Sequence, residues 1–164
     1  SCLQWKDDNV MALNNYAYYL SEQGKDLHKA ESMSYKTIKA EPNNGTYLDT
    51  YAWILFMQER YADAKTYIDA ALKNCDSTEN NGAVLEHAGD IYAMNGITDE
   101  AVEYWKKAKT DDYSSPTLDW KIKNKQYISE DELQKRMNPV ATEVKKQKTT
   151  GKATGKKAKR GRKK

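Results

Sequence analysis

The chain has 164 residues, of which 38% are hydrophobic and 31% are charged; this length fits one domain or a small repeat array and argues against a large two-domain enzyme. Residues 1–144 carry 16 basic and 24 acidic residues, a net charge of −8, whereas residues 145–164 carry 11 basic residues and no acidic one. No window of 18 or more apolar residues occurs, so no membrane-spanning segment is predicted.

Residues 1–9 align with a segment that recurs later in the chain. Cys2-Leu3 followed by Asp7-Asp8 matches Ala71-Leu72 followed by Asp76, where the second helix of a helical pair is predicted to end. A repeat buries its apolar face only against its neighbours. We therefore expect residues 1–9 to be the end of an upstream repeat, and the chain to be the C-terminal part of a longer protein.

From residue 10 onward the sequence repeats itself three times. The copies read Leu13-x2-Tyr16-Ala17-x2-Leu20, Leu48-x2-Tyr51-Ala52-x2-Leu55 and Leu85-x2-Ala88-Gly89-x2-Tyr92. A second small residue follows 12 or 13 positions later, at Ala30, Ala64 and Ala101. Apolar residues at this spacing form one stripe of a helix, and small residues let two helices approach closely. Each copy predicts two paired helices, with turns at Gly24, Glu59-Arg60-Tyr61 and Asn95-Gly96.

The repeated residues resemble the tetratricopeptide-repeat family, whose 34-residue unit follows W-x2-L-G-x2-Y, then A-x3-F, then P. The matching units are 10–44, 45–81 and 82–115. The first unit departs from the pattern by one extra residue near Asp26 and by Ser34 in place of a large apolar residue, and only this unit keeps the terminal proline, Pro42. The resemblance implies an all-α solenoid of helix-turn-helix repeats. The sequences of residues 14–20 and 47–53 resemble those of bacterial members of this family. The resemblance implies a protein of the bacterial cell envelope (periplasmic side) or of the cytoplasm.

After the third unit, residues 116–138 are predicted to form capping helices. Ser115-Pro116 is typical of a helix start, and Leu118 with Ile122 forms a narrow apolar seam. Lys121 and its polar neighbours are expected on an outer, solvated face. A second short helix is predicted to begin at the capping box 129–132 and to end before Pro139. Residues 139–164 are predicted to be a disordered, Lys-rich tail.

The inventory of catalytic groups is poor. The two histidines, His28 and His87, have no partner at metal-ligand spacing and are expected to be partly exposed surface residues. Cys2 and Cys75 form no Cys-x-x-Cys motif, and the glycines of residues 1–144 stand singly, so neither a zinc site nor a phosphate-binding loop is predicted. We therefore expect no enzymatic activity, no cofactor and no metal.

A binding surface is the remaining prediction. In the family that the chain resembles, a concave groove is lined by the second, fifth, ninth, twelfth and thirteenth residues of each repeat's first helix. Carried over, these positions are Met11, Asn14, Tyr18, Ser21 and Glu22, then Thr46, Asp49, Trp53, Phe56 and Met57, then Ala83, Glu86, Asp90, Ala93 and Met94. We call this set the groove face. It contains no lysine or arginine.

This composition indicates the chemistry of a partner. Aromatic and methionine side chains offer adaptable apolar anchors, and four carboxylates, at Glu22, Asp49, Glu86 and Asp90, supply negative charge. We expect another protein or peptide segment that is apolar with basic flanks. Only Asn14 resembles part of the carboxylate clamp of chaperone-tail-binding members, so acidic tails are a poor match. Alternatively, Trp53, Phe56 and Met57 pack between repeats or against the upstream part of a longer protein.

The basic tail supports a rival hypothesis. Its charge would give salt-sensitive contact with nucleic acid or with an anionic envelope surface; without aromatic residues it offers no base stacking. A solubilising extension, or a tail that visits the acidic part of the chain, are the other interpretations. The residues predicted to carry polyanion binding are Lys156, Lys157, Lys159, Arg160, Arg162, Lys163 and Lys164.

Overall fold

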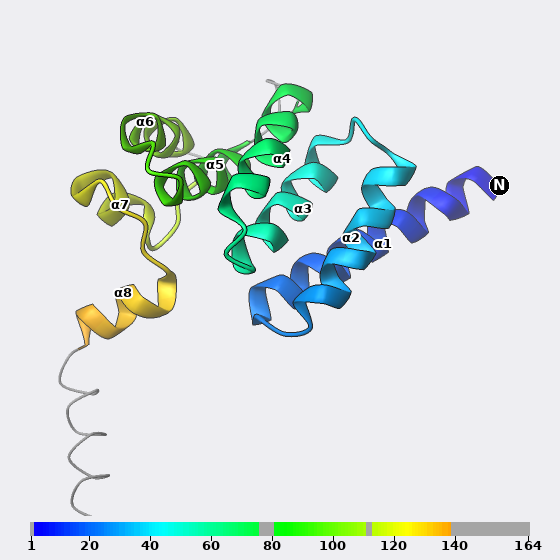
Figure 1. Cartoon of the computed structure of the whole chain (residues 1–164), viewed down its shortest axis with the longest axis horizontal. Coiled ribbons are helices and arrows are strands. Elements are labelled where there is room, and N and C mark those ends of the chain that lie inside the picture. Colours follow the sequence, from blue (N-terminus) through cyan, green and yellow to red (C-terminus); the bar gives the residue numbers. More distant parts are fainter. Residues whose placement is uncertain (1, 76–80, 111–112, 139–164) are drawn as a thin grey trace, which may run out of the picture. The chain divides into compact units, whose positions relative to one another are not determined.

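The computed structural model describes residues 2–75, 81–110 and 113–138, with only the backbone course for 2–8. Within these ranges the regular structure is entirely helical, apart from an isolated bridge between Thr110 and Tyr113. The helices are α1 (Cys2–Gln23), α2 (Leu27–Ala40), α3 (Gly45–Met57), α4 (Tyr61–Asn74), α5 (Gly82–Met94), α6 (Thr98–Ala108), α7 (Leu118–Asn124) and α8 (Glu130–Met137) (Figure 1). None of the described helices is long and apolar enough to cross a membrane.

The first six helices form three successive pairs. α1 packs on α2, α3 on α4 and α5 on α6, and the pairs stack through α2 with α3 and α4 with α5. The first helices also touch one another, α1 with α3 and α3 with α5. This arrangement is the all-α solenoid predicted from the repeats, and it brings the first helices of the three pairs onto one face.

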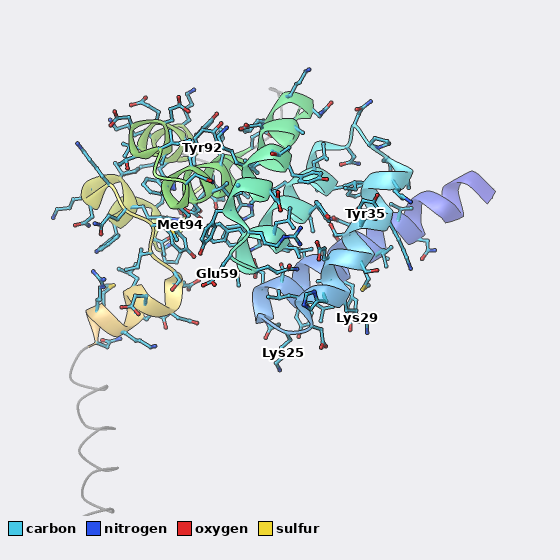
Figure 2. All side chains as sticks on the ribbon, in the orientation of Figure 1. Lys25, Lys29, Tyr35, Glu59, Tyr92 and Met94 are labelled. Carbon is cyan, nitrogen blue, oxygen red and sulfur yellow. The ribbon has the colours of Figure 1, made fainter. Side chains whose placement is uncertain are left out.

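The turns inside the pairs lie where the sequence predicts them. Gly24 and Gly96 adopt positive φ angles of 66° and 79° after α1 and α5, a conformation that glycine reaches without steric cost. Between α3 and α4 the same role falls to Glu59, at φ 62° (Figure 2). The start of α3 is capped by Asn44, whose side chain accepts a hydrogen bond from the Tyr47 amide at 3.2 Å.

The recurring small residues lie at the helix crossings. Ala17 and Ala52 are fully buried, and so are Ala30, Ala64 and Ala101. The third pair uses Gly89 instead, because the indole of Trp105 occupies the space that a methyl group would need: a Cβ built on Gly89 lies 2.3 Å from Trp105 Cδ1. Glycine and tryptophan here replace the Ala52 and Ile68 of the preceding pair.

Two boundaries differ from the sequence prediction. α1 runs unbroken from Cys2 to Gln23, so no turn separates residues 2–9 from residue 10; the segment contains neither Gly nor Pro to break it. α7 begins at Leu118 rather than at Pro116, because the Ser115 hydroxyl donates to Glu86 instead of capping the helix. The division of the chain into repeats stays a prediction.

The chain divides after Tyr127 into two compact units. The second contains α8, which begins as predicted: the Ser129 side chain accepts a hydrogen bond from the Glu132 amide at 3.2 Å. The predicted tail, including the seven basic residues proposed for polyanion binding, lies outside the described residues. Everything that follows concerns the first unit.

Gly89→Ala tests the packing of the third pair. The added methyl group would collide with Trp105, and overpacking of this kind costs about 1–3 kcal/mol. We expect urea denaturation to show that loss for Gly89→Ala, and the double variant Gly89→Ala/Trp105→Ile to lose less than the sum of the two single variants. Additive losses would show that the two side chains do not share this space.

Candidate functional site

The structure brings together side chains from the first helices of all three pairs. Tyr18 of α1 lies 6.3 Å from the ring of His87 in α5, and Trp53 of α3 stacks on the same His87 ring at 4.2 Å. Asp49 of α3 is hydrogen-bonded to His87 Nδ1 at 2.9 Å. The groove face predicted from the repeats therefore has a shared centre, at which α1, α3 and α5 meet.

The predicted positions differ widely in exposure. Exposed are Met11 (53%), Glu22, Thr46, Ala83 and Met94 (39%). Half-buried are Tyr18, Trp53, Met57 and Ala93. Buried are Asn14, Ser21, Asp49, Phe56, Glu86 and Asp90. Met94 lies at the end of α5 (Figure 2). Apolar and methionine side chains thus make up most of the accessible part, and Glu22 is its exposed carboxylate.

Two of the predicted aromatic anchors pack within the chain. Trp53 stacks on Phe56 at 4.6 Å and on His87 at 4.2 Å. Phe56 is buried and makes edge contacts with Tyr61 and with Tyr127, at 5.4 and 5.1 Å. Phe56 therefore packs inside the chain, as the alternative interpretation of the sequence predicts, and is not open to a partner. Trp53 combines this packing with a half-exposed position.

His87 is not the surface residue that the sequence predicted. Its side chain is buried and bonded to Asp49, a contact between residues 38 positions apart that local sequence does not reveal. Burial lowers the pKa of His87, but the charge and hydrogen bond of Asp49, with Asp90 and Glu86 nearby, outweigh it and raise that pKa above its usual value of 6.5. Asp49 therefore favours the imidazolium form of His87 more than solvent favours that of a free histidine.

Lys121 of α7 is also misplaced by the sequence prediction, since its side chain is only 2% exposed. Its Nζ lies 2.8 Å from Glu86 Oε2 and 2.7 Å from Asp90 Oδ1. A buried ammonium needs such partners, because an unpaired charge in the interior carries a desolvation cost of several kcal/mol. Lys121 therefore faces the carboxylates of α5 rather than solvent.

Polar groups around Lys121 complete the cluster. Glu86 accepts hydrogen bonds from Tyr113, Ser115 and Thr117, at 2.6, 2.7 and 3.1 Å, and Asp90 Oδ1 accepts one from Trp105 Nε1 at 3.0 Å. We call Glu86, Asp90 and Lys121, with these four donors, the buried ion cluster. It satisfies the carboxylates of α5 from within the chain.

The two carboxylates of the buried ion cluster titrate in opposite directions. Burial raises the pKa of Glu86, but Lys121 and the hydroxyl donors outweigh it and lower that pKa to about 2. For Asp90, burial dominates the effect of Lys121 and raises the pKa to about 6. Glu86 is thus the partner that stays ionised beside Lys121 as the pH falls.

These contacts revise the charge expected for a partner site. Asp49, Glu86 and Asp90 are buried and paired inside the chain, so they offer no open negative charge in this conformation. Glu22 remains exposed next to Tyr18. Burial, and then the hydrogen bond to Glu22, raises the pKa of the Tyr18 phenol, which stays neutral. Within the described residues no three His, Cys, Asp or Glu side chains could hold a metal.

Comparisons with known proteins place the fold. No family model matches the chain. Over 83 residues, 51% of the chain, it is 32% identical to a TPR repeat-containing protein of Pseudomonas aeruginosa, and it spans only 13% of that relative's length. The N-terminal domain of stress-induced protein-1 from C. elegans superimposes with a TM-score of 0.55 at 20% identity, over 72% of this chain and 94% of that one.

The structure has the tetratricopeptide-repeat fold, and half of the chain is similar in sequence to a TPR repeat-containing protein. A second solved structure, the TPR2AB domain of yeast Sti1 in complex with pHSP90, has a TM-score of 0.55 at 18% identity and covers 81% of this chain and 49% of that one. At these identities the solved structures establish the fold alone. The comparisons give no support to the polyanion-binding hypothesis.

Sequence reasoning missed Lys121, His87 and Tyr127 as groove-face neighbours. One signal was present for Lys121. It follows Leu118 by three positions, as Tyr51 follows Leu48 and Ala88 follows Leu85, and the tetratricopeptide pairs bury both of those residues. The equivalent residue of the first pair, Tyr16, is 45% exposed, so repeat position indicates burial only for the second and third pairs.

Replacing Lys121 should be far more harmful than replacing a neighbouring lysine. Lys121→Ala leaves two buried carboxylates without their cation, a change that typically costs about 3–5 kcal/mol. Lys123→Ala removes an exposed charge from the same helix and should stay within about 0.5 kcal/mol of the parent. Urea denaturation and amide exchange in α7 measure the difference. Equal losses would contradict burial of the Lys121 ammonium.

Asp49→Asn should lower the pKa of His87, because burial lowers this pKa and the negative charge of Asp49 that opposes burial is removed. The raised folded-state pKa means that protonated His87 stabilises the fold below pH about 6.5, a contribution lost as the pH rises through the folded-state value. NMR titration in a His28→Gln background leaves one histidine to follow, with exposed Glu59→Gln as the control. An unchanged His87 midpoint in Asp49→Asn would contradict the pair.

Proposed function

We propose that the chain is a protein-binding scaffold whose groove face receives a segment of a partner protein. The observation that carries this proposal is the meeting of the three first helices, on which Tyr18, Trp53 and Met57 are half-exposed and Met11 and Met94 exposed. The complex of the structurally similar Sti1 domain with pHSP90 supports a protein or peptide as the class of ligand. The mechanism is docking without turnover.

The accessible part of the groove face favours an apolar segment. Methionine side chains adapt to different shapes, and half-buried aromatic rings give large contact areas at low entropic cost. Met11 and Met94 are exposed large hydrophobic residues, and Met57 lies partly packed against the core. Together they provide contact area without demanding one particular side chain from the partner.

The charge of the groove face disfavours an acidic partner. It holds no lysine or arginine, and the nearby Lys121 is already held by two carboxylates. The exposed carboxylate of Glu22 beside Tyr18 favours a basic residue at that end of a bound segment. A partner that is apolar with a basic flank therefore fits the surface better than an acidic tail.

Tyr18 and its neighbour Tyr19 give a matched pair of variants. Tyr18 faces the centre of the groove face, whereas Tyr19 of the same helix is 58% exposed and stacks on Tyr16. For peptides selected from a random library on the full chain, we expect Tyr18→Ala to weaken binding at least about tenfold, as a hot-spot truncation does. Tyr19→Ala should change it by less than about threefold. Fluorescence anisotropy measures both.

The same titration separates the groove from the tail. Peptides that ignore Tyr18→Ala but are lost on deletion of residues 145–164, or above about 0.3 M salt, would place binding in the tail. That result would overturn the proposed function. Retained binding by the tail-deleted chain, with the Tyr18 effect intact, would support it.

A further inference from the structure

One stretch of the chain already lies on the groove face. We call residues 117–127 the internal segment. Through Lys121 it contacts Glu86 and Asp90 of α5, and through Tyr127 it reaches Phe56 of α3, with the ring centroids 5.1 Å apart and nearly perpendicular. It therefore touches residues of two adjacent first helices that the repeat pattern assigns to ligand contact.

The position filled by Lys121 has the features of an ammonium site. Two carboxylates lie within 2.8 Å of Nζ, and hydroxyl groups hold Glu86 in place. Aromatic rings flank the same Nζ, Trp105 at 5.7 Å and Tyr127 at 5.6 Å, distances at which a cation is attracted to a ring face. A compact ammonium with three donors matches this arrangement.

The internal segment is a short element that depends on its contacts with the rest of the chain. α7 has seven residues, fewer than an isolated helix needs to be stable in water. Its attachment depends on a few side chains, of which Leu118 and Lys121 are fully buried. Because the internal segment is part of the same chain, it has the high effective concentration of an intramolecular ligand, and it competes with any partner segment for the groove face. A partner that displaces it must offer equivalent contacts.

The buried ion cluster restricts which partner can do so. Displacing Lys121 without replacing its charge would leave Glu86 and Asp90 unpaired in a site built to exclude water, and such a loss rejects partners that lack a cation. A partner segment must therefore supply its own ammonium. An aromatic residue six positions further on would take the place of Tyr127 against Phe56.

We propose that the internal segment is a built-in ligand of the groove face, exchanged for a partner segment that carries a lysine followed six residues later by an aromatic residue. This proposal rests on the proposed function and specifies the chemistry of its partner. In the resting chain the third pair of the array is occupied, and Tyr18, Met57 and Met11 of the first two pairs are open for a first encounter. Binding then extends along the groove face as the internal segment leaves.

The test uses a fluorescent synthetic peptide with the sequence of residues 115–127, added to the full chain. Tyr127→Ala removes the contact with Phe56 and weakens the internal ligand, so this variant should bind the peptide about tenfold more tightly than the parent chain. A peptide with Lys121→Gln should bind at least tenfold more weakly than the parent peptide. The control is a peptide with Lys123→Gln, which has the same net charge as the Lys121→Gln peptide. It should bind as tightly as the parent peptide, because Lys123 is exposed in α7.

A second receptor keeps the test decisive if Tyr127→Ala does not loosen α7. The full chain with Lys121→Gln lacks its own ammonium and should gain thermal stability from the parent peptide but not from the Lys121→Gln peptide. No binding to either variant at millimolar peptide, or equal binding of the two glutamine peptides, would overturn the proposal. So would a concentration-dependent dimer that exchanges α7, since the occupant would then be a second copy.

The two experiments can distinguish failure of this proposal from failure of the proposed function. The library peptides of the preceding test are scored by their loss on Tyr18→Ala, which does not require the internal segment to move. If they bind while the 115–127 peptide does not, the groove face binds partners and the internal segment is a fixed cap.

Discussion

The lysine buried between two carboxylates is the constraint on which the arrangement of the first unit depends. Lys121 cannot lie in the interior unless Glu86 and Asp90 face it, and those carboxylates in turn need the hydroxyl and indole donors of Tyr113, Ser115, Thr117 and Trp105. α7 is therefore held by these polar contacts in addition to the apolar packing of Leu118 in the core. Groups that repeat position assigns to a ligand are used to close the array.

This closure gives the two ends of the groove face different properties. At α5 the carboxylates are buried and paired, whereas at α1 Met11 and Glu22 stay exposed and Tyr18 half-exposed. His87 lies between them, bonded to Asp49 and stacked under Trp53. Under the proposed function, a ligand at the open end would meet apolar side chains next to one carboxylate, and a ligand that extends further would meet the site filled by the Lys121 ammonium. Exposure and charge pairing thus differ between the two ends of the groove face, although its residues come from equivalent repeat positions.

The sequence predicts the helices, their pairing and their turns well, because those features follow from local spacing and recur three times. It also groups Tyr18, Asp49 and Trp53, which all lie near the His87 ring, although their role in binding stays a prediction. It fails on the burial of single residues. Lys121 and His87 are expected at the surface by residue type, yet their partners lie 31 and 38 positions away, and no local pattern encodes a pair at that distance. The unbroken α1 shows a further limit: matching Cys2-Leu3 to a helix end ignored the lack of a breaking residue.

The packing of small residues and the buried ion cluster are two parts of one solution. In the third pair Gly89 leaves space that the Trp105 indole fills, and the same indole donates its Nε1 proton to Asp90 and lies beside Lys121. An alanine at Gly89 would push the ring away from both. The second pair has Ala52 and Ile68 instead and offers no such donor. The third repeat thus departs from the common pattern at the position where the internal segment is held, so the glycine in the small-residue series is tied to the polar closure of the array.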